Sequence, residues 1–463
     1  MTIKRSKLNM GMLSVILGLA WPTMLEELMQ TAVQYIDTAM VGALGTQATA
    51  AVGATSTVNW LIGTTISALA VGFLSYIAKA FGAGDRGAAK RAVSQAALVV
   101  LVFGIFFTIL TTTLSGKIPI WMQVDDSIRQ LASEYFFILY LPMLPRTAII
   151  IFGTVLRSAG DTKTPMKVGV MMNIMNILLN FVLIYATRTV EIFGMSLLIP
   201  GAGLGVHGAA LASSIAFTIG GICLTVIVWR HPLVSPKGEK FLPNMEILRP
   251  CLKVAFPNML QRFGTSLGYV AFAAQINALG EVPTAAHTIA NTVESLFYIP
   301  GYGMQTAAAT LAGNAYGARD SQRTRDLASM FIPIEVILMI ITGALLFIFA
   351  PPMMGMFSKS QEVIDLGSTV LRMVALSEPF YGFSIIIEGM MLGVGKTKQP
   401  FVYNIVGMWG IRIVGTFICT QIFDFGFVAA WACMIAHNLL LFVLFLISYI
   451  RGTWNPLAKV YTS

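Results

Sequence analysis

Carboxylate and amide side chains lie inside otherwise apolar stretches of this chain, and they are the residues whose types and spacing could do chemistry. Asp37 is the first candidate. In a later stretch, Asn173, Asn176 and Asn180 recur at spacings of three and four, which places them on one helical face. Carboxylate and carboxamide oxygens that face each other can bind a hard cation or a proton. The alternative is a hydrogen-bond cluster that only holds helices together.

A second polar stripe follows the same periodicity in the other half of the chain. Its members are His287, Asn291, Glu294 and Tyr298, spaced by four, three and four residues. Histidine and glutamate are costly against lipid, so this face is predicted to line a water-filled cavity. A buried pair between Glu294 and an arginine, away from any cavity, is the alternative interpretation.

Other polar residues stand alone in apolar surroundings. An ionisable group at a bilayer centre costs about 2.5 to 3.5 kcal/mol on insertion scales, so each needs a reason. The candidates for a substrate cavity or for coupling, besides the stripe, are Glu26, Gln261, Glu378, Glu388 and Arg412. Structural ion pairs are the alternative for any one of them. Pro22 and Pro257 each remove a backbone donor inside an apolar stretch and are predicted to bend their helices, either as hinges or as static kinks.

The elements that must position these residues are membrane-spanning helices. Hydrophobic residues make up 56% of the chain and charged residues 11%. Backbone polar groups in lipid need partners within their own segment, so long apolar stretches must be helical. Twelve such stretches are predicted, at 12–42, 51–79, 91–115, 130–157, 165–187, 204–230, 250–279, 285–315, 327–350, 364–393, 400–423 and 427–450.

The two halves of the chain align without a gap at an offset of 235 positions. Pro22 falls on Pro257, and the glycine at 160 falls on the glycine at 395. The fold is therefore predicted to be all-α, with two six-helix lobes related by a pseudo-twofold axis along the membrane normal. The expected domains are an N-terminal lobe at 1–230, a cytoplasmic linker at 231–248 and a C-terminal lobe at 249–463.

The basic residues gather in loops on one predicted side of the membrane. The net charge of +9 therefore indicates topology rather than nucleic-acid binding, and the positive-inside rule places both termini in the cytoplasm. No phosphate-binding loop, metal-ligand spacing or nucleophile with a base is present, so we expect neither an enzyme nor a cofactor. The expected partners are the lipid bilayer and small organic substrates, and we expect a monomer.

Several segments together resemble the multidrug and toxic compound extrusion (MATE) family, a branch of a flippase-like exporter superfamily. They are Tyr35 to Gly42, Gly160 to Pro165, Asn173 to Asn180 and Gly208 to Ser213, and the resemblance covers nearly the whole chain. It implies a V-shaped pair of lobes around a central cavity, exporting organic compounds in exchange for sodium ions or protons.

The resemblance also implies a cation site in the N-terminal lobe. Its residues would be Asp37, Asn176, Asn180 and a hydroxyl at Ser213. Many bacterial relatives have a carboxylate where this chain has Asn180, so a proton competes with a sodium ion as the species held at Asp37. In the C-terminal lobe, Gln261 or Thr265 stands nearest to the seventh-helix glutamate of the sodium-coupled branch.

These observations predict a cation-coupled secondary exporter in the inner membrane of a prokaryote, working by alternating access between two lobes. The acidic groups favour amphipathic cations as substrates, whereas Arg412 favours an organic anion. A flippase for a lipid-linked saccharide is the alternative within the superfamily. A channel would usually show rings of like polar residues from several subunits, and the sequence of this chain does not indicate such rings.

Overall fold

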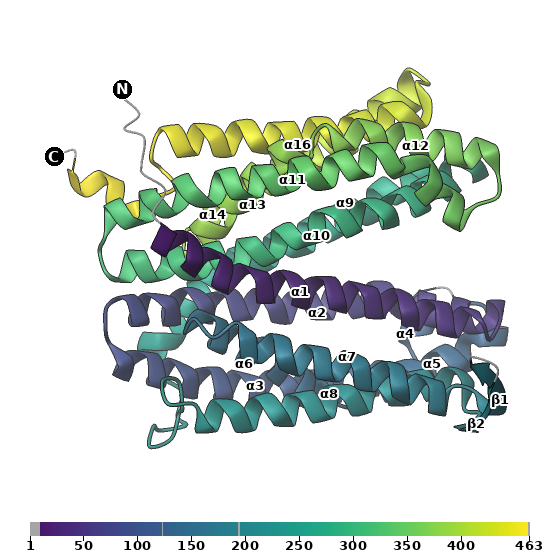
Figure 1. Cartoon of the computed structure of the whole chain (residues 1–463), viewed down its shortest axis with the longest axis horizontal. Helices are drawn as coiled ribbons and strands as arrows, with labels where there is room; N and C mark the ends of the chain where they lie inside the picture. Colours follow the sequence, from purple (N-terminus) through teal and green to yellow (C-terminus); the bar gives the residue numbers. More distant parts are fainter. Residues whose placement is uncertain (1–9, 123, 193–194, 462–463) are drawn as a thin grey trace. The chain divides into compact units, whose positions relative to one another are not determined.

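The computed structural model describes residues 10–122, 124–192 and 195–461 (Figure 1). The basic residues Lys4, Arg5 and Lys7 of the predicted cytoplasmic N-terminus lie outside that range. The helices of the first half are α1 (Met10–Gly42), α2 (Thr46–Gly82), α3 (Arg86–Leu114), α4 (Ile118–Trp121), α5 (Asp126–Tyr140), α6 (Met143–Ser158), α7 (Lys163–Leu183) and α8 (Gly205–Arg230).

The second half continues with the same type of element. Its helices are α9 (Met245–Asn277), α10 (Glu281–Gly317), α11 (Ser321–Phe357), α12 (Gln361–Ala375), α13 (Glu378–Gly393), α14 (Lys398–Ile405), the π-helical η1 (Val406–Ile413), α15 (Val414–Phe417), the π-helical η2 (Ile418–Ile422), α16 (Gly426–Ile450) and the 3₁₀-helical η3 (Pro456–Tyr461). α1 and α9 run without interruption through Pro22 and Pro257, so hinge motion at these prolines stays a prediction.

The duplication is visible in the helix boundaries. α1, α2, α5 and α6 begin and end 235 residues before α9, α10, α12 and α13 respectively. The α5–α6 pair is bent by 51° and the α12–α13 pair by 53°. Each of these pairs was predicted as one continuous span, at 130–157 and 364–393. The bends fall where Pro142 lies in the first pair and Ser377 in the second.

Among the described residues, eight helices are long and apolar enough to cross a membrane, or ten if each bent pair is one span. The remaining two predicted spans correspond to α9 and α10. These helices have 33 and 37 residues, which is ample length, but they are more polar. They carry Arg262, His287 and Glu294 among their apolar residues.

One element departs from the all-α prediction. Residues 188–203 were expected to form a simple connection, but Ala186–Ile192 (β1) pairs antiparallel with Met195–Ala202 (β2). Three threonine or valine residues between 187 and 190 explain the local preference, since β-branched residues fit an extended backbone. Hydropathy analysis gives no signal for so short a hairpin.

The chain packs as two compact units. The first comprises 1–27, 74–85 and 250–463, and the second comprises 28–73 and 86–249. These boundaries assign the beginning of α1 and the end of α2 to the unit that contains α9 to α16. The lobes predicted from the repeat, at 1–230 and 249–463, stay a prediction.

A close helix crossing inside the first unit involves equivalent residues of the two repeats. A Cβ added to Gly82 on α2 would lie 1.9 Å from the Asn314 carbonyl oxygen on α10. A Cβ added to Gly317 on α10 would lie 2.0 Å from the Lys79 carbonyl oxygen on α2. Gly82 and Gly317 are 235 positions apart, as are Lys79 and Asn314. Glycine is therefore required twice for the same reason, which is close approach of two backbones.

Candidate functional site

Asp37 lies in the second unit, where it contacts the amide stripe predicted on α7. Asn180 Nδ2 donates a hydrogen bond to Asp37 Oδ1 at 2.6 Å. The Asn180 side chain is 1% exposed and that of Asn176 is 5% exposed, whereas Asp37 is half-buried. The i, i+4 spacing on α7 thus delivers two carboxamides to one carboxylate on α1, as predicted.

Asn176 links this pair to α8. Its amide is in hydrogen-bond contact with the Ser213 hydroxyl at 3.0 Å. The amide orientation that satisfies both ends lets Asn176 donate to Asp37 Oδ1 at 2.8 Å and accept from the Ser213 hydroxyl. All four residues of the predicted cation site therefore form one connected cluster. Asn173, one turn earlier, is half-buried and lies outside the hydrogen bonds described for this cluster.

One oxygen of the cluster has no partner. Asn180 Oδ1 is buried and receives no hydrogen bond in the described part of the chain. Buried carbonyl oxygens are rarely left unsatisfied, and an orphaned one beside a carboxylate offers a ligand to a small cation. The donor set fits a hard cation or a proton, because it consists of carboxylate, carboxamide and hydroxyl oxygens.

In the first unit, Glu388 on α13 is the centre of a second amide cluster. Gln261 Nε2 on α9 donates to Glu388 Oε1 at 2.6 Å, and Asn404 Nδ2 on α14 approaches the same oxygen at 3.3 Å. Gln261 Oε1 is buried without a partner among the described residues. Gln261 and Glu388 were predicted separately, and packing brings them together. Asn404 was missed, because a single amide inside an apolar stretch carries little sequence signal.

The stripe on α10 is divided among several environments. Glu294 is 6% exposed, and Asn291 is exposed. The His287 ring packs edge-on against Phe272 on α9 and Trp431 on α16, with centroids 5.5 and 5.7 Å away. The stripe is therefore not one uniform face.

Tyr298 at the end of the stripe joins an aromatic group. Its ring lies edge-on to Tyr302 at 5.9 Å and to Tyr381 at 6.1 Å. The hydroxyls of Tyr302 and Tyr381 are hydrogen-bonded at 2.8 Å. This group links α10 to α13 near the bend that begins at Glu378.

Arg412 is held by aromatic rings. Its guanidinium lies over Phe272 at 4.4 Å and over Tyr269 at 4.9 Å, and the side chain is 4% exposed. Within the described residues, no direct ion pair joins Arg412 to Glu294, although the guanidinium acts electrostatically on that carboxyl, so the alternative of a Glu294–arginine pair stays an interpretation. Arg412 Nε has no hydrogen-bond partner there. Cation–π contacts are worth about 2 kcal/mol when desolvated, which offsets only part of the burial cost.

A buried carboxyl that the sequence analysis missed is Glu335 on α11. It is fully buried, and neither carboxyl oxygen has a hydrogen-bond partner in the described chain. Gly301 on α10 and Gly382 on α13 make room for it, since a Cβ at Gly301 would lie 2.5 Å from Glu335 Oε1. The cost of a carboxyl inside the predicted span 327–350 was the signal that could have found it.

The remaining predicted residues, Glu378 and Glu26, belong to the first unit. Glu378 is 2% exposed and its Oε2 has no partner among the described residues. Glu26 is half-buried on α1. Beside Pro22, the Thr23 hydroxyl donates to the Gly303 carbonyl oxygen on α10 at 2.8 Å. This bond anchors the first turns of α1 to the unit that holds Glu335, Glu378 and Glu388.

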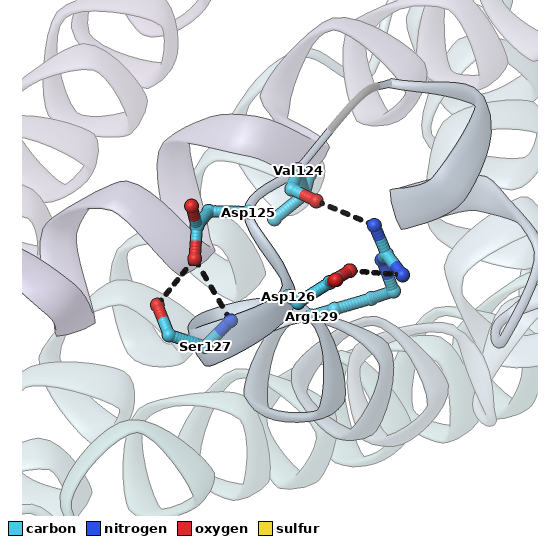
Figure 2. A network of polar contacts seen from close by, with 5 residues as sticks. All are labelled: Val124, Asp125, Asp126, Ser127 and Arg129. Atoms are coloured by element: carbon cyan, nitrogen blue, oxygen red, sulfur yellow. Dashed lines mark hydrogen bonds and ion pairs between the residues drawn. The ribbon is translucent and has the colours of Figure 1, made fainter.

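A polar network of five residues lies at the start of α5 (Figure 2). Asp125 Oδ1 accepts hydrogen bonds from the Ser127 backbone amide at 2.8 Å and from its hydroxyl at 2.6 Å. These bonds hold the pKa of the Asp125 carboxyl below its ordinary value. Arg129 forms an ion pair with Asp126 and donates to the Val124 carbonyl oxygen at 3.1 Å. The network is the N-terminal cap of α5.

Comparisons with known proteins agree with the duplication and with the family predicted from the sequence. The MatE family model matches residues 22–182 and 257–418, and the two matches begin 235 positions apart. The probable multidrug resistance protein NorM of Thermotoga maritima is 26% identical over 443 residues, covering 96% of this chain and 93% of the relative. The uncharacterized transporter YisQ of Bacillus subtilis is 25% identical, covering 91% of this chain and 90% of the relative.

Solved structures share the fold. A transporter of the MOP superfamily from Pyrococcus furiosus aligns with a TM-score of 0.88 at 23% identity, covering 98% of this chain and all of the other. The outward-facing structure of a multidrug resistance MATE family transporter gives the same score, identity and coverage. Because the family model spans most of both repeats and includes Asp37, Asn176 and Asn180, the chain belongs to the MatE family of membrane transporters.

Proposed function

We propose that this protein is a secondary active exporter of organic compounds, driven by inward movement of protons or sodium ions. Cation binding at Asp37 and substrate binding alternate in the cycle. Two relatives described as probable multidrug resistance proteins, from Thermotoga maritima and Neisseria meningitidis, support drug-like substrates. The basic loops support an inner-membrane protein with both termini in the cytoplasm.

The observation that carries this proposal is the cluster of Asp37 with Asn176, Asn180 and Ser213. A half-buried carboxylate receives amide hydrogens, while a buried carbonyl oxygen beside it has no partner among the described residues. A proton on Asp37 or a sodium ion shared with Asn180 Oδ1 would satisfy the cluster. The cluster therefore favours a state with a bound cation over an empty one.

The test is Asp37→Asn in the full chain, reconstituted in liposomes. The variant keeps the side-chain volume and a hydrogen-bonding group but loses the charge. Export of an organic dye driven by a proton gradient and by a sodium gradient should fall at least about tenfold, as expected for loss of an ionisable group at a coupling site. Wild-type rates in the variant would reject Asp37 as the coupling residue.

The matched control is Asn173→Ala, one turn away on the same helix. Asn173 lies outside the described cluster, so its removal should leave both gradient-driven rates near those of the wild type. Thermal unfolding of both variants in detergent separates a coupling defect from a folding defect. If Asp37→Asn unfolds early while Asn173→Ala does not, the cluster is a packing device rather than a cation site.

Arg412 supports a second candidate substrate class, the organic anions. A buried guanidinium with an unpartnered Nε, held against two rings, offers a site for a carboxylate. The surrounding carboxyls Glu294 and Glu378 favour cations instead. The sign of the transported substrate is therefore decided by which of these groups reaches it.

A further inference from the structure

A groove on the second unit lies where α8 ends and the following loop turns back. It has a volume of about 340 Å³ and is lined by Thr225, Val226, Trp229, Arg230 and Lys237. The first four belong to the last turns of α8, which is apolar enough to span a membrane. Trp229 and Arg230 therefore stand at the boundary between the apolar segment and water, where tryptophan side chains gather in membrane proteins.

The two ends of the groove differ in chemistry. Val226 and the Trp229 ring supply an apolar wall, and Arg230 and Lys237 supply two exposed cations. In the described part of the chain, neither cation has an ion-pair partner. The neighbouring acid Asp161 lies 3.7 Å from His231, so it is already engaged. An apolar wall beside two unpaired cations is complementary to an amphipathic anion.

The groove is preformed because the loop that carries Lys237 is fixed. The Ser235 hydroxyl donates to the Trp229 carbonyl oxygen at 2.7 Å, and the Phe241 ring stacks on Trp229 at 6.1 Å. Gln95 on α3, which is 2% exposed, holds the loop at two points. Its Nε2 donates to the Leu242 carbonyl oxygen and its Oε1 accepts from the Asn244 amide, both at 2.9 Å. Little ordering cost then remains for binding.

We propose that this groove binds the phosphate headgroup and upper acyl chain of an anionic phospholipid. Arg230 and Lys237 contact the phosphate, and Val226 and Trp229 contact the chain. A soluble phosphate would leave the apolar wall uncovered, and a lipid without net charge would gain less from the two cations. The site is separate from the Asp37 cluster, so its fate is independent of the proposed transport function.

The test uses delipidated full-length protein in a neutral detergent, titrated with phosphatidylglycerol, phosphatidylcholine or inorganic phosphate. Native mass spectrometry measures bound lipid. The double variant R230Q/K237Q should bind phosphatidylglycerol on the order of tenfold more weakly than wild type, since each cation near a membrane surface contributes appreciably. K240Q removes an equal charge from the same loop outside the groove and should bind like wild type.

A second readout places the lipid chain. Phosphatidylglycerol with brominated acyl chains should quench tryptophan fluorescence in wild type, and Trp229→Phe should remove part of that quenching. Equal phosphatidylglycerol binding by wild type and R230Q/K237Q would overturn the proposal, as would an equal loss in K240Q. Full competition by inorganic phosphate, with no quenching by brominated lipid, would show that the groove binds free phosphate and would overturn the lipid proposal. If the double variant unfolds, the single variants R230Q and K237Q carry the same comparison.

Discussion

The same helix contact carries opposite chemistry in the two repeats. In the second unit, Asp37 on α1 is bonded to Asn180 on α7. The residue 235 positions after Asp37 is Phe272, and in the first unit its ring lies against Arg412, 4.4 Å from the guanidinium. A carboxylate facing amides in one repeat thus corresponds to a ring facing a cation in the other. The duplication has kept the contact and exchanged its charge.

A change in helix type accompanies the exchange. α7 is a regular α-helix, whereas the equivalent stretch of the second repeat contains the π-helical η1 from Val406 to Ile413. A π-helical turn inserts extra residues and rotates the side chains that follow it, and such turns are frequent at functional sites. Arg412 lies in this segment. The comparison motivates the proposal that the Asp37 cluster holds the coupling cation and that the Arg412 environment accepts an anion.

The largest effect should come from reversing the charge at Arg412. Arg412→Glu should reduce export of anionic dyes about a hundredfold, because losing a buried charged partner costs 2 to 5 kcal/mol in binding. Export of cationic dyes should be retained or increased. Arg372→Glu is the control, since Arg372 also lies over a ring but is exposed. A parallel loss for both dye classes would make Arg412 a packing residue.

A tenfold change in sodium dependence is expected when a second carboxylate is added beside Asp37 in the first repeat. Asn180→Asp places a carboxylate where an amide now donates to Asp37 at 2.6 Å. Two adjacent carboxylates need a shared proton or a metal ion, so the sodium concentration for half-maximal export should fall about tenfold. Rates measured against sodium concentration at fixed pH check this. An unchanged sodium dependence would assign the cluster to protons alone.

Equivalent substitutions at the α2–α10 helix crossing should lower the stability of the protein by equal amounts, whereas substitutions at the candidate sites should not. Gly82→Ala and Gly317→Ala each force a Cβ onto a backbone carbonyl, so each should lower stability by about 1 to 3 kcal/mol. Gly410→Ala, with no atom within 4 Å of the added Cβ, should cost little. Thermal unfolding in detergent measures all three. Clearly unequal losses of stability in Gly82→Ala and Gly317→Ala would show that the two sides of the α2–α10 crossing are not equivalent.

A smaller effect is expected where the repeats differ in one turn residue. Gly84 has φ of 74° and open space around its Cβ position, and its equivalent Arg319 has φ of 54°. Gly84→Ala should cost about 1 kcal/mol and Arg319→Gly should gain a similar amount, because only glycine adopts this conformation without strain. The same unfolding assay applies. A loss of stability in Arg319→Gly would mean that its side chain makes a contact worth more than the strain.

The smallest effect concerns helix starts. Asp125 caps α5, whereas its equivalent Ser360 at the start of α12 makes no side-chain capping bond. Asp125→Ala should speed hydrogen exchange of the first α5 amides, and Ser360→Ala should leave those of α12 unchanged. Because its pKa is lowered in the folded state, the Asp125 contribution is present above the ordinary carboxyl pKa and is lost as pH falls through the lowered value. Equal hydrogen-exchange rates of these amides in wild type and Asp125→Ala would show that the Asp125 cap does not stabilise the start of α5.

The sequence by itself determined the membrane class, the duplication and the cluster around Asp37. All three follow from the length of apolar segments and from the spacing of residues along the chain. Apolar length decides that a segment spans a membrane, and i, i+4 spacing decides that Asn176 and Asn180 share a face. The face of a membrane helix that carries amides must turn away from lipid. The contact of Asn180 with Asp37 could therefore be predicted from the sequence.

Only the tertiary structure decided the partners of the other buried groups. Arg412 lies against the Phe272 ring, Gln261 bonds to Glu388, and Glu335 fits between two glycines. These outcomes depend on which helices touch and how closely, and on a π-helical turn that shifts side-chain direction. Sequence spacing within one helix carries no information about that distance, so the sequence named candidate residues in the second repeat but not their partners.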